Sequence, residues 1–416
     1  MNLYLVSMAK VLIIGAGHAG GTAAALLRQY GFAGDIVLAG AEPSPPYQRP
    51  PLSKAWLKGE ADLEGLLLRP LSFYAEQDID LRPDSLATAI DRTARIVTFA
   101  DGRVEAWDVL VLATGSRARK LPVPGADRPD LIELRTLEDA ERLKGQLGPG
   151  RRLAVVGGGY VGLEAAASAR ALGATVVVVE RMDRVLARVA SPELSAFFTT
   201  LHEGHGVSIR LSAEVAGFEP DGVRLSDGSL IEADATLVGV GAVADDQLAR
   251  DAGLDCDSEH SGGILVDGFA RTSDPAIFAI GDVTRHPVPV HGGIMHRLES
   301  VPNALEQARQ FACAITDRPP PAPEVPWFWS DQYDVKLQIA GLPFGADRRI
   351  LRGSPADHSF AVFHLKSDTI VSVEAVNAGP EFMMGRQLIG RGRSVDPTAL
   401  ADLSVSMKAV AAGSTS

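Results

Sequence analysis

The chain has 416 residues, enough for two or three domains with well-filled cores, and its 40 basic and 52 acidic residues give a formal net charge of −12. This acidic balance argues against nucleic acid as a partner, because binding a phosphate backbone requires a net basic face. Two cysteines, Cys256 and Cys313, lie far apart in the sequence and in no metal-binding spacing, which fits a reducing compartment and predicts no metal site.

No run of 18 apolar residues is present, so we expect no membrane-spanning helix and no membrane partner. Residues 3–6 are apolar but lack the basic segment and the cleavage site of a signal peptide. The expected location is therefore the cytoplasm.

The chain opens with a strand–turn–helix pattern. Residues 11–14 form an apolar strand that runs into Gly15-x-Gly17-x-x-Gly20, and a helix over residues 21–30 and a second strand to residue 39 follow. This spacing is typical of a dinucleotide-binding unit, whose glycines allow a tight turn and the close approach of a pyrophosphate. The acid expected after the second strand is displaced, because Ala41 stands there and Glu42 is the first carboxylate.

Proline and glycine signals organise the next hundred residues. Residues 44–52 are too rich in proline for a regular helix or a central strand, and a helix is expected after Lys54. Residues 78–98 indicate strands with a turn, Asp101-Gly102 indicates a hairpin turn, and residues 109–113 indicate a buried strand.

A second and more complete dinucleotide-binding pattern follows a helix start with a capping box at residues 135–139. The apolar strand 153–156 leads into Gly157-x-Gly159-x-x-Gly162, a helix extends to about residue 172, and the next strand ends on Glu180. This glutamate is placed to accept hydrogen bonds from an adenosine ribose, and its charge would repel a 2′-phosphate, so the sequence favours NAD over NADP. Three nearby arginines keep that preference open: Arg181, Arg184 and Arg188.

The remaining elements are predicted from periodicity and turn residues. Helices are expected over residues 192–204, 302–316, 380–390 and 396–403, and strands over 207–211, 223–225, 235–240, 264–268, 277–280, 335–341, 350–352, 360–365 and 370–375. Residues 318–326 hold five prolines in nine positions and indicate a linker. The order predicts an α/β chain with two Rossmann-like dinucleotide-binding domains, the second inserted in the first, followed by a small C-terminal α+β domain.

Eight segments together make the chain similar to a known family: GAGHAG, RPPLSK, ATGSRARKLPVPG, LRTLEDA, GGGYVGLE, IFAIGDV, ESVPNALEQA and PWFWSDQY. Over about residues 11–403 the chain resembles the FAD- and NADH-dependent ferredoxin reductases of bacterial oxygenase systems, which have a glutathione-reductase-like fold. The resemblance implies an FAD-binding domain over residues 1–117 and 246–320, an NAD-binding domain over 118–245 and a C-terminal domain over 325–416.

Carried over position by position, the resemblance implies FAD contacts from fourteen residues: Gly15, Gly17, Ala19, Gly20, Ala41, Glu42, Arg49, Pro50, Lys54, Ala87, Arg135, Asp282, Val301 and Trp329. Lys54 is expected beside the isoalloxazine, Ala87 at the adenine through its backbone, and Asp282 on the ribityl chain. Family members usually carry an acid where this chain has Ala41, and Glu42 is a shifted candidate for that role.

On the NAD side the resemblance implies contacts from Gly157, Gly159, Gly162, Glu164 and Glu180, with Glu164 at the nicotinamide. A cation at Lys54 favours the anionic reduced flavin and stabilises the charge that arrives with a hydride, so Lys54 and Glu164 are the candidate catalytic residues. Plainer interpretations stay open, because Glu164 could merely complement the dipole of its helix and Trp329 could be a core or interface aromatic.

The cysteines and histidines suggest no further chemistry. Disulfide reductases and NADH peroxidases of this fold need a redox-active cysteine at the flavin, and neither Cys256 nor Cys313 lies in such a motif. His286, His291 and His296 show no ligand spacing and are expected to be solvated.

The function that the resemblance implies is therefore a monomeric NADH:ferredoxin oxidoreductase. Electrons pass from NADH through FAD to a [2Fe–2S] ferredoxin, which feeds a cytochrome P450-type monooxygenase or a dioxygenase. Rubredoxin reductase is an alternative within the fold, since the sequence separates these acceptors poorly. A non-enzymatic NADH-responsive flavoprotein resembling apoptosis-inducing factor is an alternative from another class. A plain NADH oxidase is a third, although its usual cysteine near the flavin is missing.

Overall fold

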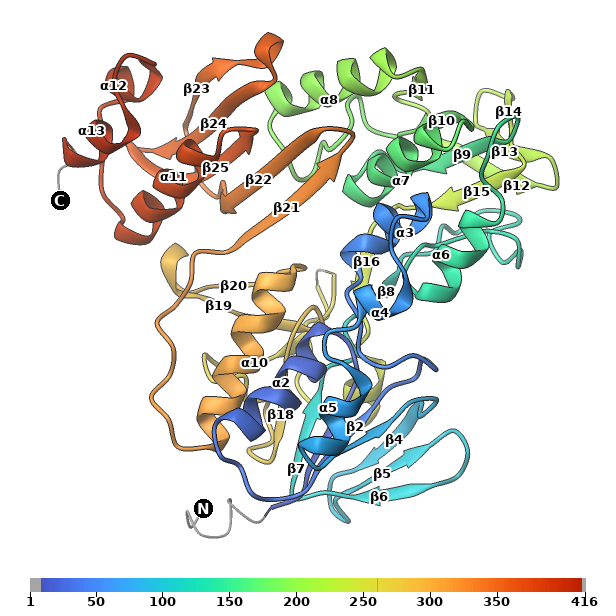
Figure 1. The fold of residues 1–416 in the computed structure, drawn as a ribbon, viewed down its shortest axis with the longest axis vertical. Coiled ribbons are helices and arrows are strands. Elements are labelled where there is room, and N and C mark those ends of the chain that lie inside the picture. The colour runs from blue at the N-terminus through green and yellow to red at the C-terminus, as the bar shows by residue number, and fades with distance from the viewer. Residues whose placement is uncertain (1–8, 260, 414–416) are drawn as a thin grey trace. The chain divides into compact units, whose positions relative to one another are not determined.

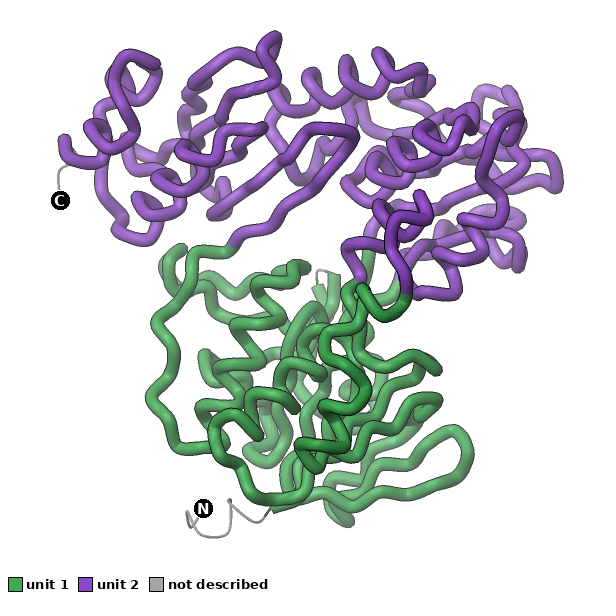
Figure 2. Tube along the Cα trace, viewed as in Figure 1, with its two compact units in different colours: residues 1–48, 63–117, 242–326 green, residues 49–62, 118–241, 327–416 purple. Residues whose placement is uncertain are grey.

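A computed structural model describes residues 9–259 and 261–413, so the expectation for residues 3–6 lies outside the described residues. The chain divides into two compact units, which Figure 2 shows in different colours. Unit 1 consists of residues 1–48, 63–117 and 242–326, and unit 2 of residues 49–62, 118–241 and 327–416. Each unit is therefore assembled from segments that are distant in the sequence. None of the described helices is long and apolar enough to cross a membrane.

Unit 1 is built on a five-stranded sheet in the order β3-β2-β1-β7-β18, with every neighbouring pair parallel. The strands are β1 (Val11–Ile14), β2 (Ile36–Ala39), β3 (Ile79–Arg82), β7 (Val109–Leu112) and β18 (Ile277–Ala279). The central strands are buried along their whole length, as expected for a parallel sheet that is covered on both faces.

Two layers cover this sheet (Figure 1). The helices α2 (His18–Gln29) and α10 (Val301–Ile315) pack against one face, where Ile13 belongs to the same core as Phe311. An antiparallel meander of β4 (Ala87–Asp91), β5 (Ile96–Phe99) and β6 (Val104–Ala106) covers the other, where Leu12 shares a core with Phe99. Neighbouring residues of β1 thus serve opposite layers, as the period of a strand requires.

The smaller elements of unit 1 complete its surface. They are α4 (Leu63–Leu66), α5 (Leu71–Glu76), β8 (Ser116–Ala118, whose last residue falls in unit 2), β16 (Ala242–Ala244), α9 (Gln247–Asp251), β17 (Ile264–Leu265), β19 (Thr284–Val288), η2 (Pro289–His291) and β20 (Ile294–His296). Two expectations needed correction here. Helix α2 begins at His18 rather than at residue 21, because the last glycine of the fingerprint is part of the helix, and the strand expected over residues 264–268 covers two residues only.

Unit 2 contains a second parallel sheet in the order β11-β10-β9-β15. Its strands are β9 (Arg152–Val156), β10 (Thr175–Val179), β11 (Val207–Arg210) and β15 (Ala235–Val238), and its helices are α6 (Leu137–Lys144), α7 (Tyr160–Ala171) and α8 (Pro192–Gly204). A small antiparallel sheet of β12 (Val215–Glu219), β13 (Gly222–Leu225) and β14 (Leu230–Glu232) flanks it. The segments η1 (Pro50–Ser53) and α3 (Ala55–Lys58) also belong to this unit and pack against α7.

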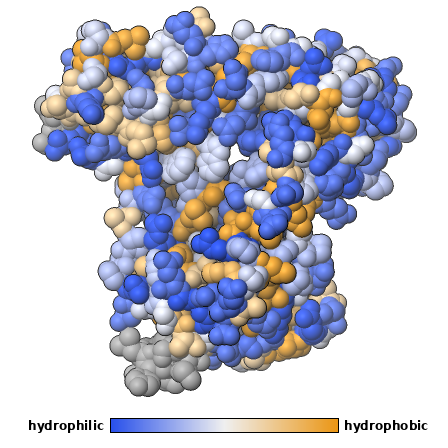
Figure 3. All heavy atoms as spheres, in the orientation of Figure 1, coloured by the Kyte–Doolittle hydropathy of each residue, from blue (hydrophilic) through white to orange (hydrophobic). Residues whose placement is uncertain are grey.

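The C-terminal part of unit 2 is an antiparallel sheet in the order β21-β22-β25-β24-β23 with α11 (Gly379–Arg391) packed on it. The strands are β21 (Trp327–Gln332), β22 (Val335–Gly341), β23 (Arg348–Ser354), β24 (Ser359–Lys366) and β25 (Thr369–Val376), and η3 (Pro355–Asp357), α12 (Pro397–Ala401) and α13 (Met407–Ala412) complete the fold. Polar and charged residues cover most of the face seen in Figure 3, with apolar residues interspersed.

The two ends of the segment 118–241 lie next to each other. Within unit 1, the amide of Asp245 donates to the carbonyl of Gly115 at 3.0 Å. Within unit 2, the amide of Arg119 donates to the carbonyl of Gly241 at 2.9 Å. The outgoing and returning strands are thus held together on both sides of the boundary.

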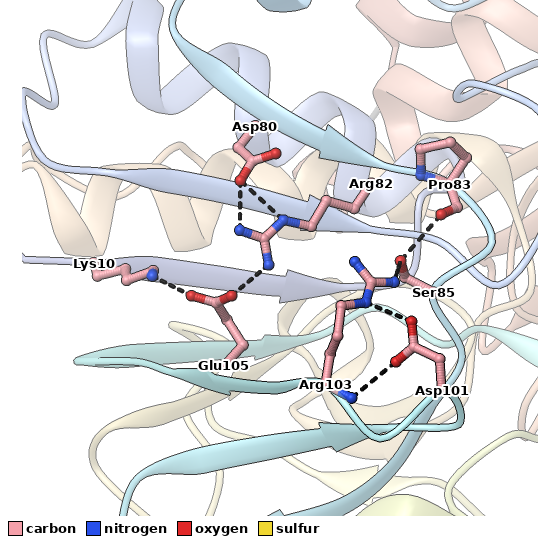
Figure 4. Close-up of polar contacts among 8 residues, drawn as sticks. All are labelled: Lys10, Asp80, Arg82, Pro83, Ser85, Asp101, Arg103 and Glu105. Atoms are coloured by element: carbon pink, nitrogen blue, oxygen red, sulfur yellow. Dashed lines mark hydrogen bonds and ion pairs between the residues drawn. The ribbon is translucent and has the colours of Figure 1, made fainter.

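A network of charged side chains ties the meander of unit 1 to its parallel sheet (Figure 4). Glu105 on β6 accepts hydrogen bonds from Lys10, just before β1, and from Arg82 at the end of β3, and Arg82 also bonds Asp80 at 2.6 Å. Partial burial alone would raise the pKa of Glu105, but the hydrogen bonds and charges of Lys10 and Arg82 outweigh it and lower this pKa.

Because the pKa of Glu105 is lower in the folded than in the unfolded chain, its contribution to stability is present above the unfolded pKa and is lost as the pH falls. We predict that Glu105→Gln lowers the free energy of unfolding by about 1–2 kcal/mol at pH 7, and that the difference shrinks below about pH 4. Urea unfolding at both pH values measures it. Glu76→Gln, at an exposed position of α5, is the control, and an equal loss in both variants would contradict the prediction.

Candidate functional site

Each unit contains one glycine turn between the first strand of its parallel sheet and the following helix, and the two turns have the same geometry. Gly15 has a φ of +112° and Gly157 a φ of +106°, a region of conformation that favours glycine. A Cβ atom on Gly15 would lie 2.2 Å from the carbonyl oxygen of Ala113, and one on Gly157 would lie 2.4 Å from that of Gly239. The first glycine of each fingerprint therefore lets a neighbouring strand end pack against the turn.

The other fingerprint glycines differ from one another in what surrounds them. A Cβ on Gly20 would lie 1.9 Å from the carbonyl oxygen of Gly15, and one on Gly162 would lie 2.3 Å from that of Gly157, so these glycines let the helix pack on the turn. A Cβ on Gly17 or Gly159 would meet no described atom within 4 Å. The middle glycine thus borders open space in both units, as expected where a backbone leaves room for a pyrophosphate.

The helices that follow these turns begin without side-chain caps. The caps of α2 and α7 are Gly17 and Gly159, with no side-chain hydrogen bond and no acidic residue in the first turn. By contrast, Thr136, Ser191 and Ser300 cap α6, α8 and α10 with their hydroxyl oxygens. Neither α2 nor α7 thus begins on a side-chain cap, and an anionic diphosphate suits the positive start of such a helix. On these observations the chain fits two dinucleotides, one in each unit.

Glu180 lies at the rim of the turn in unit 2. Its carboxylate accepts hydrogen bonds from the amide of Gly158 at 2.7 Å and from that of Met182 at 2.8 Å, which fixes it beside the glycine loop. Arg184 is bound to the protein instead, donating to the carbonyl oxygens of Ala187 and Ala190 at 2.9 Å each. Of Arg181, Arg184 and Arg188, which kept the nucleotide preference open, Arg184 thus has a structural role.

The corresponding position in unit 1 carries no acid. The paired strands place Ile14 opposite Ala39 as they place Val156 opposite Val179, so Gly40 stands where Glu180 stands in unit 2. A Cβ there would lie 2.7 Å from that of Ala16. Two residues further, Glu42 accepts a hydrogen bond from the hydroxyl of Tyr47.

A hollow of about 300 Å³ adjoins this position, lined by Ala41, Asp84, Leu86, Phe99, Ala100 and Asp101. Asp84 occupies the place of Ser212 in unit 2, since both have a positive φ and donate their amides to equivalent carbonyls, those of Glu42 and Met182. Sequence reasoning missed Asp84, because only the pairing of β3 with β2 brings it to Ala41. Ala87 begins the neighbouring strand β4.

The segments that carry Asp282 and Ala19 and the helix that begins at Val301 pack together in unit 1 near the carboxyl end of β18. Asp282 follows β18, and the hydroxyl of Ser116 donates to its carboxylate at 3.3 Å. A Cβ on the preceding residue, Gly281, would lie 2.9 Å from the Cβ of Ala19, so this strand end packs on the start of α2. Gln307 of α10, the helix that begins at Val301, accepts the amide of Gly281 at 2.7 Å.

Lys54 and Glu164 form an ion pair within unit 2, with Nζ 2.7 Å from Oε2. Glu164 is 5% exposed, and the hydroxyl groups of Ser53 and Ser330 donate to its two carboxylate oxygens at 2.5 and 2.6 Å. Three donors thus satisfy the buried charge, which burial would otherwise disfavour strongly. The sequence did not reveal either serine, because their contacts with Glu164 depend on the packing of η1 and β21 against α7.

Arg49, Pro50 and Arg135 lie beside this pair in the same unit. Arg49 donates to the carbonyl of Arg135 at 2.6 Å, and Lys54 donates to that of Pro50 at 3.1 Å. Trp329 lies on β21, half-buried, with its ring 5.7 Å from that of Trp327. Since side chains alternate along a strand, Trp329 points away from the face on which Ser330 meets Glu164.

The prediction that the three histidines are solvated was wrong for His286. This residue lies on β19, is 9% exposed, and burial lowers its pKa. His296 pairs with it on β20, and burial together with nearby positive charge lowers its pKa to about 4. The proline and glycine content indicated a loop, whereas the segment folds as a hairpin. In the described part of the chain no group of three or more potential ligands could hold a metal ion.

The cysteines are free, and Cys313 is buried on α10. Burial raises the pKa of Cys256 to about 11, so this group stays a thiol at neutral pH.

Two such nucleotide-binding units and an antiparallel C-terminal domain define a flavoprotein oxidoreductase of the two-dinucleotide class. Residues 9–308 match the family model "Pyridine nucleotide-disulphide oxidoreductase", and residues 327–411 match "Reductase C-terminal". The chain belongs to the pyridine nucleotide-disulphide oxidoreductase family. It is an enzyme whose cofactors are FAD and NADH.

Several relatives match nearly the whole chain. The "Probable ferredoxin reductase CtmF" of Castellaniella defragrans is 49% identical over 97% of this chain and 98% of its own. Putidaredoxin reductase of Pseudomonas putida is 42% identical over 97% of each. A crystal structure of the covalent putidaredoxin reductase–putidaredoxin complex matches with a TM-score of 0.93 and 42% identity, covering 97% of this chain and 98% of that one.

The open space at the middle glycines gives a prediction for each unit. Gly17→Val should yield a folded protein with little bound flavin, and Gly159→Val should retain flavin while its KM for NADH rises at least about tenfold, because each side chain enters the space left for one diphosphate. Absorbance at 450 nm and steady-state kinetics measure the two effects. Both glycines have φ near −84°, which valine adopts, so a loss of folding in either variant would contradict this interpretation.

Proposed function

We propose that the enzyme is an NADH:ferredoxin reductase that supplies electrons to an oxygenase. In this function NADH delivers a hydride to FAD, and a [2Fe–2S] ferredoxin carries the electrons away one at a time to a cytochrome P450-type monooxygenase or a dioxygenase. The observation that carries the proposal is the pair of equivalent glycine turns with open middle glycines, one in each unit. The relatives whose names include a ferredoxin reductase support the choice of acceptor.

We propose that FAD binds in unit 1, with its diphosphate at the turn of Gly15, Gly17, Ala19 and Gly20. Asp282 would hold the ribityl chain and Ala87 the adenine. The uncapped start of α2 and the packing of Ala19 on Gly281 support this assignment. Ala41 carries no acid, and the carboxylates that line the hollow beside it are those of Asp84 and Asp101. Glu42, the next residue along the chain, is already engaged by Tyr47.

We propose that NADH binds in unit 2, at Gly157, Gly159 and Gly162, with its adenosine ribose on Glu180. The same dinucleotide would reach Glu164, whose carboxylate accepts a hydrogen bond from the nicotinamide amide. FAD supplies the acceptance of a hydride and the release of single electrons. Lys54 supplies a positive charge that Glu164 holds in a fixed position, and this preorganised charge stabilises the negative charge that arrives with the hydride.

The remaining assignments follow the same reasoning. Arg49, Pro50, Arg135, Val301 and Trp329 are proposed to complete the FAD site. We also propose the domain limits given by the resemblance, a monomeric enzyme and a cytoplasmic location, which suits its NADH dependence and its two free thiols.

An anaerobic titration tests the proposed function. We predict that NADH bleaches the flavin within one equivalent, that NADPH does so at least about tenfold more slowly, and that a [2Fe–2S] ferredoxin added afterwards restores the oxidised spectrum. Absorbance at 450 nm follows each step. A long-lived charge-transfer band that ferredoxin leaves unchanged would refute the proposed function. Reoxidation by rubredoxin but not by ferredoxin would show that rubredoxin is the acceptor.

The carboxylate of Glu180 gives a separate prediction on nucleotide choice. Glu180→Ala removes the charge that opposes a 2′-phosphate together with two hydrogen bonds to the loop, so the ratio of kcat/KM for NADH to that for NADPH should fall by at least about tenfold. Steady-state kinetics with both nucleotides measure the ratio. Glu203→Ala, on the exposed surface of α8, should leave the ratio unchanged, and an unchanged ratio in Glu180→Ala would show that selection lies elsewhere.

A further inference from the structure

A continuous series of hydrogen-bonded side chains leads away from Glu164 through the interior of unit 2. Ser330 and Gln332 are neighbours on one face of β21, His202 lies on α8, and Tyr333 follows β21. Glu164, Ser330, Gln332 and His202 are 5, 1, 1 and 0% exposed, so water does not compete for their hydrogen bonds. The proposed contact of Glu164 with the nicotinamide does not explain why a buried imidazole ends this series.

The carboxylate of Glu164 determines the direction of the hydrogen bonds from Glu164 as far as His202. Ser330 donates its hydroxyl to Glu164 at 2.6 Å, which leaves its oxygen to accept the amide of Gln332 at 3.1 Å. The remaining oxygen of Gln332 must then accept from Nε2 of His202, 2.8 Å away. The other ring nitrogen of His202, Nδ1, lies 3.2 Å from the hydroxyl of Tyr333. Nε2 of His202 therefore carries a proton, and in the neutral imidazole Nδ1 is the acceptor.

Such a series can orient groups but cannot conduct a proton efficiently, because the amide of Gln332 has donors and an acceptor at fixed atoms. Its physical effect is on Glu164. With Gln332 occupying the serine oxygen as a donor, the hydroxyl of Ser330 can only point its hydrogen at the carboxylate, and a hydrogen bond to the charged form favours that form. Burial lowers the pKa of His202 to about 4, so the imidazole keeps this neutral state throughout the neutral range.

We propose that His202 and Gln332 are positioning residues for Glu164, which hold the hydroxyl of Ser330 as a donor and so keep the Glu164 carboxylate oriented toward Lys54. This inference rests on the proposed role of Glu164 at the nicotinamide. It gives the contact between α7 and β21 a function, which is to orient the Glu164 carboxylate through Ser330. The titratable and charged groups that face the series are Lys54 at the Glu164 end, and Tyr333, His205 and Arg170 at the His202 end.

The experiment uses the FAD-loaded enzyme and measures the rate of flavin reduction by NADH from about pH 5 to 9 in a stopped-flow instrument. We expect His202→Phe and Ser330→Ala to shift the acid limb of the profile upward by about one pH unit, a tenfold change in the proton concentration at which the rate is half-maximal. His202→Gln, whose amide can donate to Gln332, should restore the limb at least in part. A role in stability alone would lower the melting temperature and leave the limb in place.

His205→Phe is the matched control, because His205, the C-cap residue of α8, stacks on Tyr333 with ring centroids 3.7 Å apart but is hydrogen-bonded to Leu201 rather than to the series. Its profile should equal that of the wild type. If His202→Phe and Ser330→Ala also equal the wild type, the inference is overturned. If His202→Phe does not fold, Ser330→Ala decides, since it removes only one oxygen atom.

Glu164→Gln separates this inference from the proposed function. If Glu164→Gln slows reduction and flattens the acid limb while Ser330→Ala and His202→Phe do neither, Glu164 keeps its role and the positioning series fails. If Glu164→Gln itself has the wild-type profile, the proposed role of Glu164 fails and the inference fails with it.

Discussion

The nucleotide-binding architecture depends on one steric constraint, the approach of a backbone carbonyl to the first glycine of each fingerprint. At Gly15 and Gly157 a Cβ atom would lie within 2.4 Å of that oxygen, a distance that no packed structure tolerates. Because this contact brings the end of a neighbouring strand against the turn, it also sets the direction in which the following helix starts. In both units the turn that this contact fixes carries an open middle glycine and a helix start without a side-chain cap. A protein that repeats this arrangement repeats the binding geometry too.

The charged groups of unit 2 show how an otherwise unfavourable arrangement is maintained. An ion pair as buried as Lys54–Glu164 contributes little to folding, since desolvation of both charges offsets their attraction. Two serine hydroxyls nevertheless donate to the carboxylate, and behind Ser330 an amide and an imidazole continue an ordered series of donors. Structures keep such arrangements where a charge must occupy a defined place, and hydride transfer to a flavin is a reaction that benefits from a fixed positive charge.

Much of this organisation follows from local sequence. The glycine spacing, the capping box at Thr136 and the buried strands are local patterns, and the structure confirms each of them. The first helix was placed three residues late, because Gly20 looked like part of the turn. What the sequence could not supply depends on pairing between distant segments. Asp84 reaches the rim of unit 1 only through β3, and His202 reaches Gln332 only through the packing of α8 near β21. His286 is buried because its hairpin packs within unit 1, although the prolines of this segment indicated a loop.

The paired backbone bonds at Gly115–Asp245 and Arg119–Gly241 make the inserted segment resemble a long hairpin loop. A loop whose ends are already adjacent adds little closure entropy to its host, so residues 118–241 could enter an ancestral chain without disturbing the strand order of unit 1. The same geometry makes the segment a natural cassette. On the proposed assignment, exchanging it between relatives would transfer nucleotide preference while the unit proposed to bind FAD keeps its own sheet, so the preferences for electron donor and for prosthetic group can evolve independently.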